Sequence, residues 1–217
     1  MKTIISISIF CLLGNLSLAV QSQRPNIIMF LIDDQNPSSI AAFGGDTFTP
    51  NLDRMAQEGM KFTRAYVSSS VCTPSRYSFL TGRFAGNSHS KLYVDAVGGK
   101  ENQGLPNFNV ALERDNMNVG NVLREAGYTT GFVGKFHLTS NLDFPEFYKG
   151  KDKWINIPKN ARPGPETSAQ FKHNERWMRR YLRELGFSWA KNVYPENTPS
   201  PYSTHNPEWT TVAALEF

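Results

Sequence analysis

The amino-acid sequence reads NIIMFLIDD at residues 26–34, and this stretch decides the fold class. Residues 26–32 form an apolar run rich in isoleucine, which predicts a strand buried on both faces, as in a parallel sheet. Two carboxylates, Asp33 and Asp34, follow the run directly. In open α/β sheets ligands bind beyond the carboxyl ends of the strands. The stretch therefore predicts both a sheet and the edge at which a site would form.

Strand and helix signals alternate along the rest of the chain. In the first predicted helix Thr49 can cap, Pro50 suits the first turn, and Gly59 can end the helix in a left-handed conformation. The predicted elements are strands over 61–67 and 128–133, and helices over 49–59, 118–126, 170–185 and from 207 onward. This alternation predicts an α/β fold with a mostly parallel central sheet sandwiched by helices.

The composition excludes several other classes of protein. The chain has 217 residues, of which 40% are hydrophobic, so it can bury one sizeable core and is neither a disordered tail nor a repeat array. Two cysteines exclude a disulfide-dense scaffold. The net charge of +4 suits an anionic partner without identifying one.

The first nineteen residues have the pattern of a signal peptide. Lys2 gives a positive start, residues 4–13 are apolar, and Ser17 and Ala19 form a small-residue cleavage site. Retention of this segment as a membrane anchor is the alternative, although the apolar run is short for a bilayer. We expect cleavage, export to the periplasm or the medium, and no stable membrane insertion. Cys11 would leave with the peptide, so that Cys72 remains alone.

The second half of the sequence is less regular. Residues 144–165 indicate an irregular insertion, and residues 194–206 a proline-rich loop. In the helix over 170–185 the apolar residues are Met178, Tyr181, Leu182 and Leu185, and the basic ones are Lys172, Arg176, Arg179, Arg180 and Arg183. The basic side is either an ordinary solvated face or a contact for a polyanionic substrate.

The predicted last helix reaches Phe217 with no capping residue, glycine or polar tail after it. We therefore expect a truncated chain.

Two adjacent carboxylates, Asp33 and Asp34, are the first candidate site residues. They repel each other unless a cation joins them, and hard oxygen ligands select Ca²⁺ or Mg²⁺. A turn with helix-capping carboxylates is the alternative.

The second candidate site is the run from Cys72 to Arg83. Pro74 suits a helix start, which places Cys72 where backbone N–H groups and the helix dipole stabilise negative charge. Arg76 could turn back to the same place as a forked donor. The run predicts a nucleophile in an oxyanion pocket; an inert cysteine on a capped surface helix is the alternative.

The third candidate site is the segment Gly134-Lys135-Phe136-His137. If the strand continues through it, Lys135 and His137 project to the same side. A cation and a titratable imidazole there suit an anionic ester, with Lys135 for charge and His137 for proton transfer. Alone the signal is weak, because both residues are ordinary at strand ends.

Together these segments resemble the formylglycine-dependent sulfatases, which have an alkaline-phosphatase-like fold. The resemblance is carried by Cys72 to Arg83, by Asp33-Asp34, by residues 49–54 and by residues 134–137, all in the family's order. It is close from Pro25 to Leu138 and diffuse afterwards. Family members are longer and take further metal and site residues from later segments. The resemblance therefore implies that residues 20–217 are the N-terminal part of an incomplete catalytic domain. We expect the 217-residue chain to be inactive and poorly stable by itself.

The resemblance implies a role for each matching residue. Cys72 would be oxidised to formylglycine (3-oxoalanine) by a maturation enzyme that reads Cys72, Pro74 and Arg76. Asp33, Asp34 and the modified Cys72 would bind Ca²⁺, in preference to Mg²⁺. Arg76 would hold the modified residue, Lys135 would bind the sulfate, and His137 would contact the aldehyde hydrate.

The resemblance also implies an activity and its partners. We expect a sulfuric ester hydrolase that acts on a sulfated small molecule or glycan, with no nucleic-acid partner. The alternatives are a phosphonate or phosphate ester hydrolase with the same modified cysteine, and an inactive fragment that only binds sulfated glycans.

Overall fold

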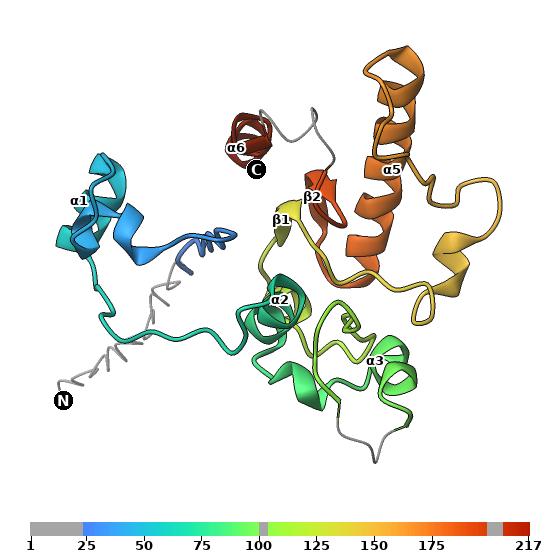
Figure 1. The fold of residues 1–217 in the computed structure, drawn as a ribbon, viewed down its shortest axis with the longest axis horizontal. Helices are drawn as coiled ribbons and strands as arrows, with labels where there is room; N and C mark the ends of the chain where they lie inside the picture. Colours follow the sequence, from blue (N-terminus) through green and yellow to red (C-terminus); the bar gives the residue numbers. More distant parts are fainter. Residues whose placement is uncertain (1–23, 100–103, 199–205) are drawn as a thin grey trace, which may run out of the picture. The chain divides into compact units, whose positions relative to one another are not determined.

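A computed structural model of the chain describes residues 24–99, 104–198 and 206–217. Figure 1 traces the chain, which divides into two units, residues 1–50 and 51–217. Each unit is described by itself. The predicted signal peptide over residues 1–19 lies outside the described residues.

The first unit contains two short 3₁₀ helices, η1 (Pro37–Ser39) and η2 (Ala41–Phe43). The predicted strand over residues 26–32 is wrong, because this segment is irregular and Ile28 and Phe30 are each 76% exposed. A strand buried on both faces needs hydrogen-bonded neighbours and covering helices. Within the described residues, strand pairing is found only between two later segments. In the part of the chain that the structure describes, the apolar run is therefore not part of a sheet.

Helix α1 (Pro50–Glu58) confirms the first predicted helix. Thr49 Oγ1 accepts a hydrogen bond from the Ala41 N–H at 3.0 Å. The expected left-handed stop at Gly59 is wrong, since its N–H donates to Met55 O at 3.0 Å and its φ is not positive. The strand predicted over residues 61–67 is also wrong: this segment is irregular and exposed.

The second unit continues with a parallel strand pair and the helices around it. Its elements after α1 are α2 (Cys72–Thr81), η3 (Ala85–Asn87), α3 (Lys91–Ala96), α4 (Val119–Glu125), β1 (Gly131–Lys135), η4 (Pro145–Tyr148), α5 (Pro165–Glu184), β2 (Trp189–Tyr194) and α6 (Asn206–Glu216). Strands β1 and β2 are parallel, and α5 lies in the crossover between them. This confirms the parallel pairing and the predicted helices. Strand β2 was not predicted.

The β1–β2 pair contains a bulge at Asn192. Val133 pairs with Lys191, but Gly134 pairs with Val193, so Asn192 is an extra residue in β2. Its φ of +51° is left-handed. Such a bulge re-aims the side chains that follow it.

Side chains on the two sides of the strand pair contact different helices. Trp189 lies against Phe217 with ring centroids 5.1 Å apart, and Tyr194 lies 6.3 Å from Trp209 of α6. Ala190 and Val193 instead belong to the buried core that includes α5. Figure 1 shows α5 and α6 on opposite sides of the pair. The expected helix sandwich is thus present locally.

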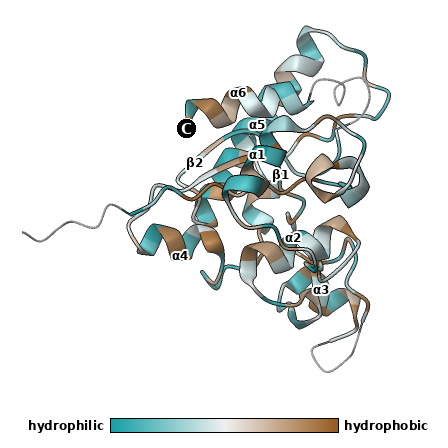
Figure 2. Cartoon of the chain, turned by 90° about the vertical axis from the view of Figure 1, so that its left-hand side faces the viewer, coloured by the Kyte–Doolittle hydropathy of each residue, from teal (hydrophilic) through white to brown (hydrophobic). Residues whose placement is uncertain are grey.

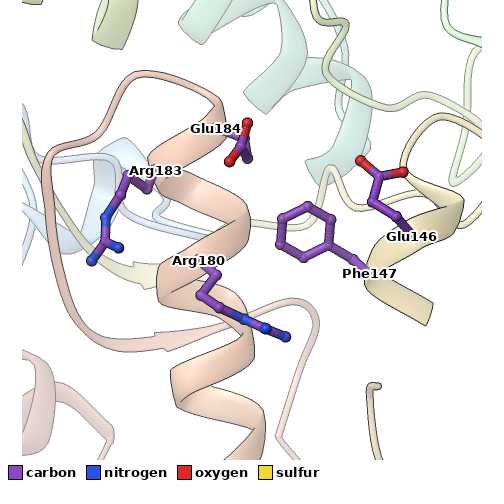
Figure 3. Close-up of a pocket in the computed structure, with 5 residues that line it drawn as sticks. All are labelled: Glu146, Phe147, Arg180, Arg183 and Glu184. Carbon is purple, nitrogen blue, oxygen red and sulfur yellow. The ribbon is translucent and has the colours of Figure 1, made fainter. Parts of the chain in front are cut away.

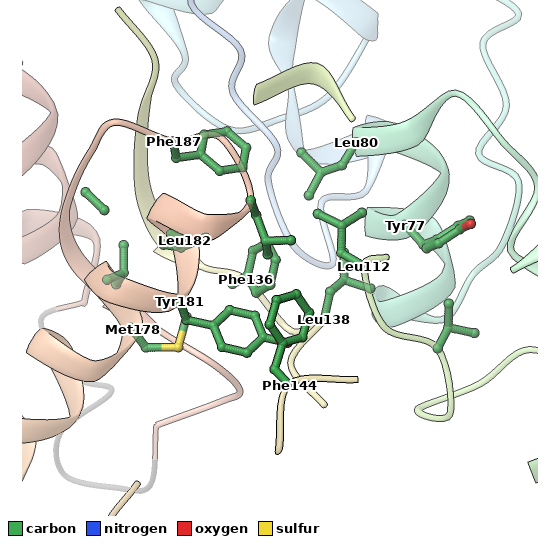
Figure 4. Close-up of a cluster of buried hydrophobic side chains, with 14 of the residues drawn as sticks. Tyr77, Leu80, Leu112, Phe136, Leu138, Phe144, Met178, Tyr181, Leu182 and Phe187 are labelled. Carbon is green, nitrogen blue, oxygen red and sulfur yellow. The ribbon is translucent and has the colours of Figure 1, made fainter. Parts of the chain in front are cut away.

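The core of the second unit is built around α5 and the segment after β1. Figure 4 shows Tyr181 and Met178 of α5 close to Phe136, Leu138 and Phe144. Tyr77 and Leu80 of α2 complete the opposite side of the cluster. The buried residues Met178, Tyr181 and Leu182 of α5, with Leu185 directly after the helix, are the predicted apolar stripe, which is confirmed.

Helix α4 is present, and the residues that it buries are small or polar. Asn118 caps it by accepting hydrogen bonds from the N–H groups of Gly120 and Asn121 at 2.9 and 3.2 Å. Gly120 and Asn121 are buried, whereas Val122 is 51% exposed. Figure 2 shows hydrophobic and hydrophilic residues side by side along α4. Close packing of Phe187 on Gly120, where an added Cβ would lie 2.9 Å from the ring, selects this face.

The segment 144–165 is irregular apart from η4, as expected, yet it packs on the core. Phe144 is fully buried, and Phe147, Tyr148 and Trp154 pack against the same cluster. Across the described ranges, no helix has both the length and the apolar character needed to cross a bilayer.

Candidate active site

Helix α2 places Cys72 at its first residue, as the sequence predicts. The first helical hydrogen bond runs from the Ser75 N–H to Val71 O at 3.1 Å, and Pro74 has no N–H. The amides of Cys72 and Thr73 therefore precede the hydrogen-bonded ladder, at the positive end of the helix dipole. This end of α2 favours negative charge at residue 72.

Cys72 lies beside His137. Its Sγ is 3.3 Å from His137 Nδ1, although 65 residues separate the two along the chain. The thiol is partly buried. A proton can pass directly between the side chain at position 72 and the imidazole, which is what a nucleophile with an adjacent base requires.

The backbone of His137 is left-handed, with a φ of +58°. The neighbouring side chains of Phe136 and Leu138 are fully buried, and the Phe136 N–H donates to Tyr194 O at 2.9 Å. These contacts fix the chain on both sides of His137. Strand β1 ends at Lys135 and the chain turns at His137, so the condition under which Lys135 and His137 would project to the same side is not met. A non-glycine residue in this conformation stores strain of about 1 kcal/mol, which the surrounding contacts must maintain.

Arg76 and Lys135 are joined through the backbone. Arg76 Nη1 donates to Lys135 O at 2.7 Å, and the two residues are only 8% and 7% exposed. This bond ties the second turn of α2 to the end of β1. The direct grip of Arg76 on residue 72 stays a prediction, as does the contact of Lys135 with sulfate.

A buried carboxylate lies behind α2 and was missed by the sequence reasoning. Glu113 Oε1 accepts hydrogen bonds from Tyr77 Oη at 2.9 Å, from Ser88 Oγ at 2.7 Å, and from the N–H groups of His89 and Ser90 at 2.8 and 3.1 Å. Burial and, next, the Glu113 charge raise the pKa of Tyr77 well above its ordinary value of 10.0. The network holds α2 against residues 88–90 and 113.

Phe108 and Asp115 also support the candidate residues. The Phe108 ring lies 5.5 Å from the His137 ring and is 63% exposed. Asp115 forms an ion pair with Arg83, just beyond the end of α2, and its hydrogen bond raises the pKa of Arg83. Nothing in the local sequence marks these residues, because their contacts join segments that are distant along the chain.

Asp33 and Asp34 belong to the first unit, and their metal role stays a prediction. Asp34 has a left-handed φ of +56°, as in a turn. Carboxylate oxygens fit a hard cation in kind, but Ca²⁺ takes six to eight oxygen ligands. Over the described ranges, no three His, Cys, Asp or Glu side chains are grouped so as to hold a metal ion.

Comparison with known proteins gives a consistent result. Residues 25–196 match the family described as Sulfatase. The chain is 32% identical to human arylsulfatase G over 167 residues, which cover 76% of this chain and 29% of that protein. It is 36% identical to rat N-acetylgalactosamine-6-sulfatase over 154 residues, which cover 66% of this chain and 27% of that protein. The chain thus spans less than a third of the length of these relatives.

Proposed function

This chain belongs to the sulfatase family and has its α/β, alkaline-phosphatase-like fold, and from that premise we propose that the protein hydrolyses sulfate esters at Cys72. The observation that carries the proposal is the 3.3 Å contact between Cys72 Sγ and His137 Nδ1 at the start of α2. Two relatives are named as sulfatases, one of them for a sulfated sugar. We extend this to a carbohydrate sulfate ester as the substrate.

Conversion of Cys72 to formylglycine is part of the proposal. The surroundings of residue 72 fit the change, because the side chain is partly exposed and lies at a helix N-terminus, which stabilises oxygen-bearing, negatively charged groups. The hydrated aldehyde would supply a hydroxyl nucleophile. Pro74 and Arg76 are buried in the folded chain, so we propose that the maturation enzyme reads them before α2 packs.

We assign a separate role in the reaction to each of the side chains His137, Arg76 and Lys135. His137 would hold or move a proton at Nδ1, the atom that faces residue 72. Arg76 and Lys135 supply positive charge on the α2 and β1 sides, and the free amides at the start of α2 add a partial positive charge. A sulfate ester gains negative charge on its leaving oxygen as the bond breaks, so these groups stabilise the transition state more than the ground state.

Asp33 and Asp34 are proposed to supply two of the oxygen ligands of Ca²⁺. When bound, the ion would neutralise charge on the sulfate group. Because two adjacent carboxylates are too few for its coordination shell, we base no step of the reaction on the ion.

The decisive experiment is mass spectrometry of the Cys72 peptide. The chain is expressed with a formylglycine-generating enzyme, beside Cys72→Ala and a control peptide of known conversion. We expect formylglycine at position 72. Unmodified Cys72, in a preparation in which the control is converted, would contradict the proposal.

The reaction itself is tested on the full-length protein that contains this chain. We expect release of sulfate from an aryl sulfate and loss of that release in Cys72→Ala. An aryl phosphate serves as the comparison substrate. Faster release of phosphate than of sulfate would assign the site to phosphate esters instead.

A further inference from the structure

Helix α5 carries a continuous row of cations on the side away from the core. The fully buried side chains of Met178, Tyr181 and Leu182 fix the rotation of the helix. The α5 basic row consists of the exposed residues Lys172, Arg176, Arg179 and Arg183. They follow one another at spacings of four, three and four residues, which places them on one helical face. At about 1.5 Å per residue the row is about 17 Å long.

Two carboxylates near the row, those of Glu175 and Asp152, have partners outside it. Glu175 accepts a hydrogen bond from the Asn192 N–H at 3.0 Å and so faces β2. Asp152 lies 3.9 Å from Arg180, which is not part of the row. Among the residues that the structure describes, no carboxylate forms an ion pair with a member of the α5 basic row.

One end of the row borders a hollow of about 330 Å³. Figure 3 shows its lining: Arg180, Arg183 and Glu184 project from α5, and Glu146 and Phe147 come from η4. Glu146 is paired with Arg114, which leaves Glu184 as the acidic group beside Arg183. The hollow therefore adds a mixed-charge end to an otherwise cationic row.

We propose that the α5 basic row binds a sulfated polysaccharide along its length. Four cations in a line of this length match a polymer with repeated anionic groups, whereas a single sulfate would contact only one or two of them. The inference rests on the proposed function, because it names the polymer whose sulfate esters would be hydrolysed. The row holds the chain of the polymer, while Cys72 and His137 act on one ester.

A nucleic acid fits the row less well. Proteins that bind single-stranded nucleic acid combine cations with aromatic side chains on which bases stack. Of the α5 aromatic residues, Trp177 and Tyr181 are buried in the core and Phe171 is half-buried, and the row itself contains no aromatic residue. A sulfated glycan needs no such stacking.

The test compares two variants of the 217-residue chain that lose the same charge. The first replaces the row by Lys172→Gln, Arg176→Gln, Arg179→Gln and Arg183→Gln. The control changes four exposed cations of the irregular segment, Lys149→Gln, Lys151→Gln, Lys159→Gln and Arg162→Gln. Binding to a heparin oligosaccharide, to unsulfated dextran and to a single-stranded DNA of equal charge is measured over a range of salt concentrations.

We expect the row variant to bind heparin at least about 10-fold more weakly, with a smaller salt dependence, while the control keeps most of its affinity. Circular dichroism should show the same helix content in both. Equal losses in the two variants, or equally tight binding of DNA, would overturn the proposal. Binding needs no turnover, so a protein that binds heparin through the row and releases no sulfate would reject the proposed function alone.

Discussion

His137 combines a chemical role with an unusual backbone. Its imidazole lies 3.3 Å from Cys72, and its φ of +58° is costly for a residue with a Cβ. Turns of this kind usually carry Gly, Asn or Asp. Retention of a strained conformation beside the candidate nucleophile indicates that the geometry of the site selects this residue.

Two replacements of His137 separate the chemical role of its imidazole from the cost of its left-handed backbone. We expect His137→Gly to unfold with a free energy about 1 kcal/mol higher than His137→Ala, because glycine adopts the left-handed conformation without strain. Both variants of the full-length protein should lose sulfate release by about 100-fold or more, since both lack the imidazole. Urea unfolding of the chain and an aryl sulfate assay check the two statements. Equal stabilities for the two variants would show that the backbone at position 137 is unstrained.

For single residues, the sequence predicts which residues form the candidate site better than it predicts the contacts that hold them in place. The helix start at Cys72 follows from Pro74, and Lys135 and His137 lie at the end of β1. The contact of Arg76 with the Lys135 carbonyl oxygen could not be predicted, because it joins positions 59 residues apart. The left-handed turn at His137 likewise has no local signal, since histidine is an ordinary strand residue.

The bulge in β2 sets how this strand pairs with β1, the strand that leads to His137. Before the bulge Ala190 faces the core, and after it Val193 does, so the extra Asn192 reverses the alternation. Asn192 is buried, its N–H donates to Glu175 Oε1, and its Nδ2 donates to Trp209 O. The shift lets Lys135 pair with Tyr194, directly before the turn at His137.

We expect Asn192→Val to destabilise the chain by about 2 kcal/mol or more, because valine disfavours a left-handed φ and cannot make the hydrogen bond to the Trp209 carbonyl. Asn192→Gly keeps the conformation and should cost less, about 1 kcal/mol for the lost side-chain bond. Thermal and urea unfolding measure both. A glycine variant that is no more stable than the valine variant would mean that the left-handed conformation is unimportant here.

Helices were predicted more reliably than strands, and the reason is physical. Caps, turn residues and the 3.6-residue period are local, so α1, α2, α5 and α6 could be identified from sequence. A strand needs a partner, and the apolar run over residues 26–32 has no paired neighbour among the described residues. Strand β2, which lacks such a run, forms because β1 and α5 provide its contacts.

In the second unit as a whole, stability depends on tyrosines buried with their hydroxyl groups protonated. Tyr181 is fully buried among the rings of Phe144 and Trp177, and its Oη accepts a hydrogen bond from the Ser140 N–H at 3.0 Å. Burial raises its pKa well above 10.0, and burial together with the Glu113 charge does the same for Tyr77. Burial also raises the pKa of Tyr148, which packs on Trp177. All three shifts favour the neutral phenol in the folded state.

The sign of the resulting pH dependence follows directly. Below pH 10 these tyrosines are protonated in both states, so they contribute no pH dependence. Above pH 10.0 the unfolded chain releases the phenolic protons and the folded chain retains them, so the free energy of unfolding falls as pH rises. Each fully shifted tyrosine contributes a slope of up to about 1.4 kcal/mol per pH unit.

We expect Tyr77→Phe to reduce this slope by about 1 kcal/mol per pH unit between pH 10 and 11, where the unfolded phenol is only partly ionised, after a cost at pH 8 of about 1 kcal/mol for the lost bond to Glu113. Tyr66→Phe is the matched control, because Tyr66 is 89% exposed. Urea unfolding at pH 8, 10 and 11, with tyrosinate absorbance recorded in parallel, measures the effect. If Tyr77→Phe kept the slope of the unsubstituted chain, the Tyr77 hydroxyl would titrate equally in the folded and unfolded states. The hydrogen bond to Glu113 and the burial of the ring would then not keep the Tyr77 hydroxyl protonated in the folded chain.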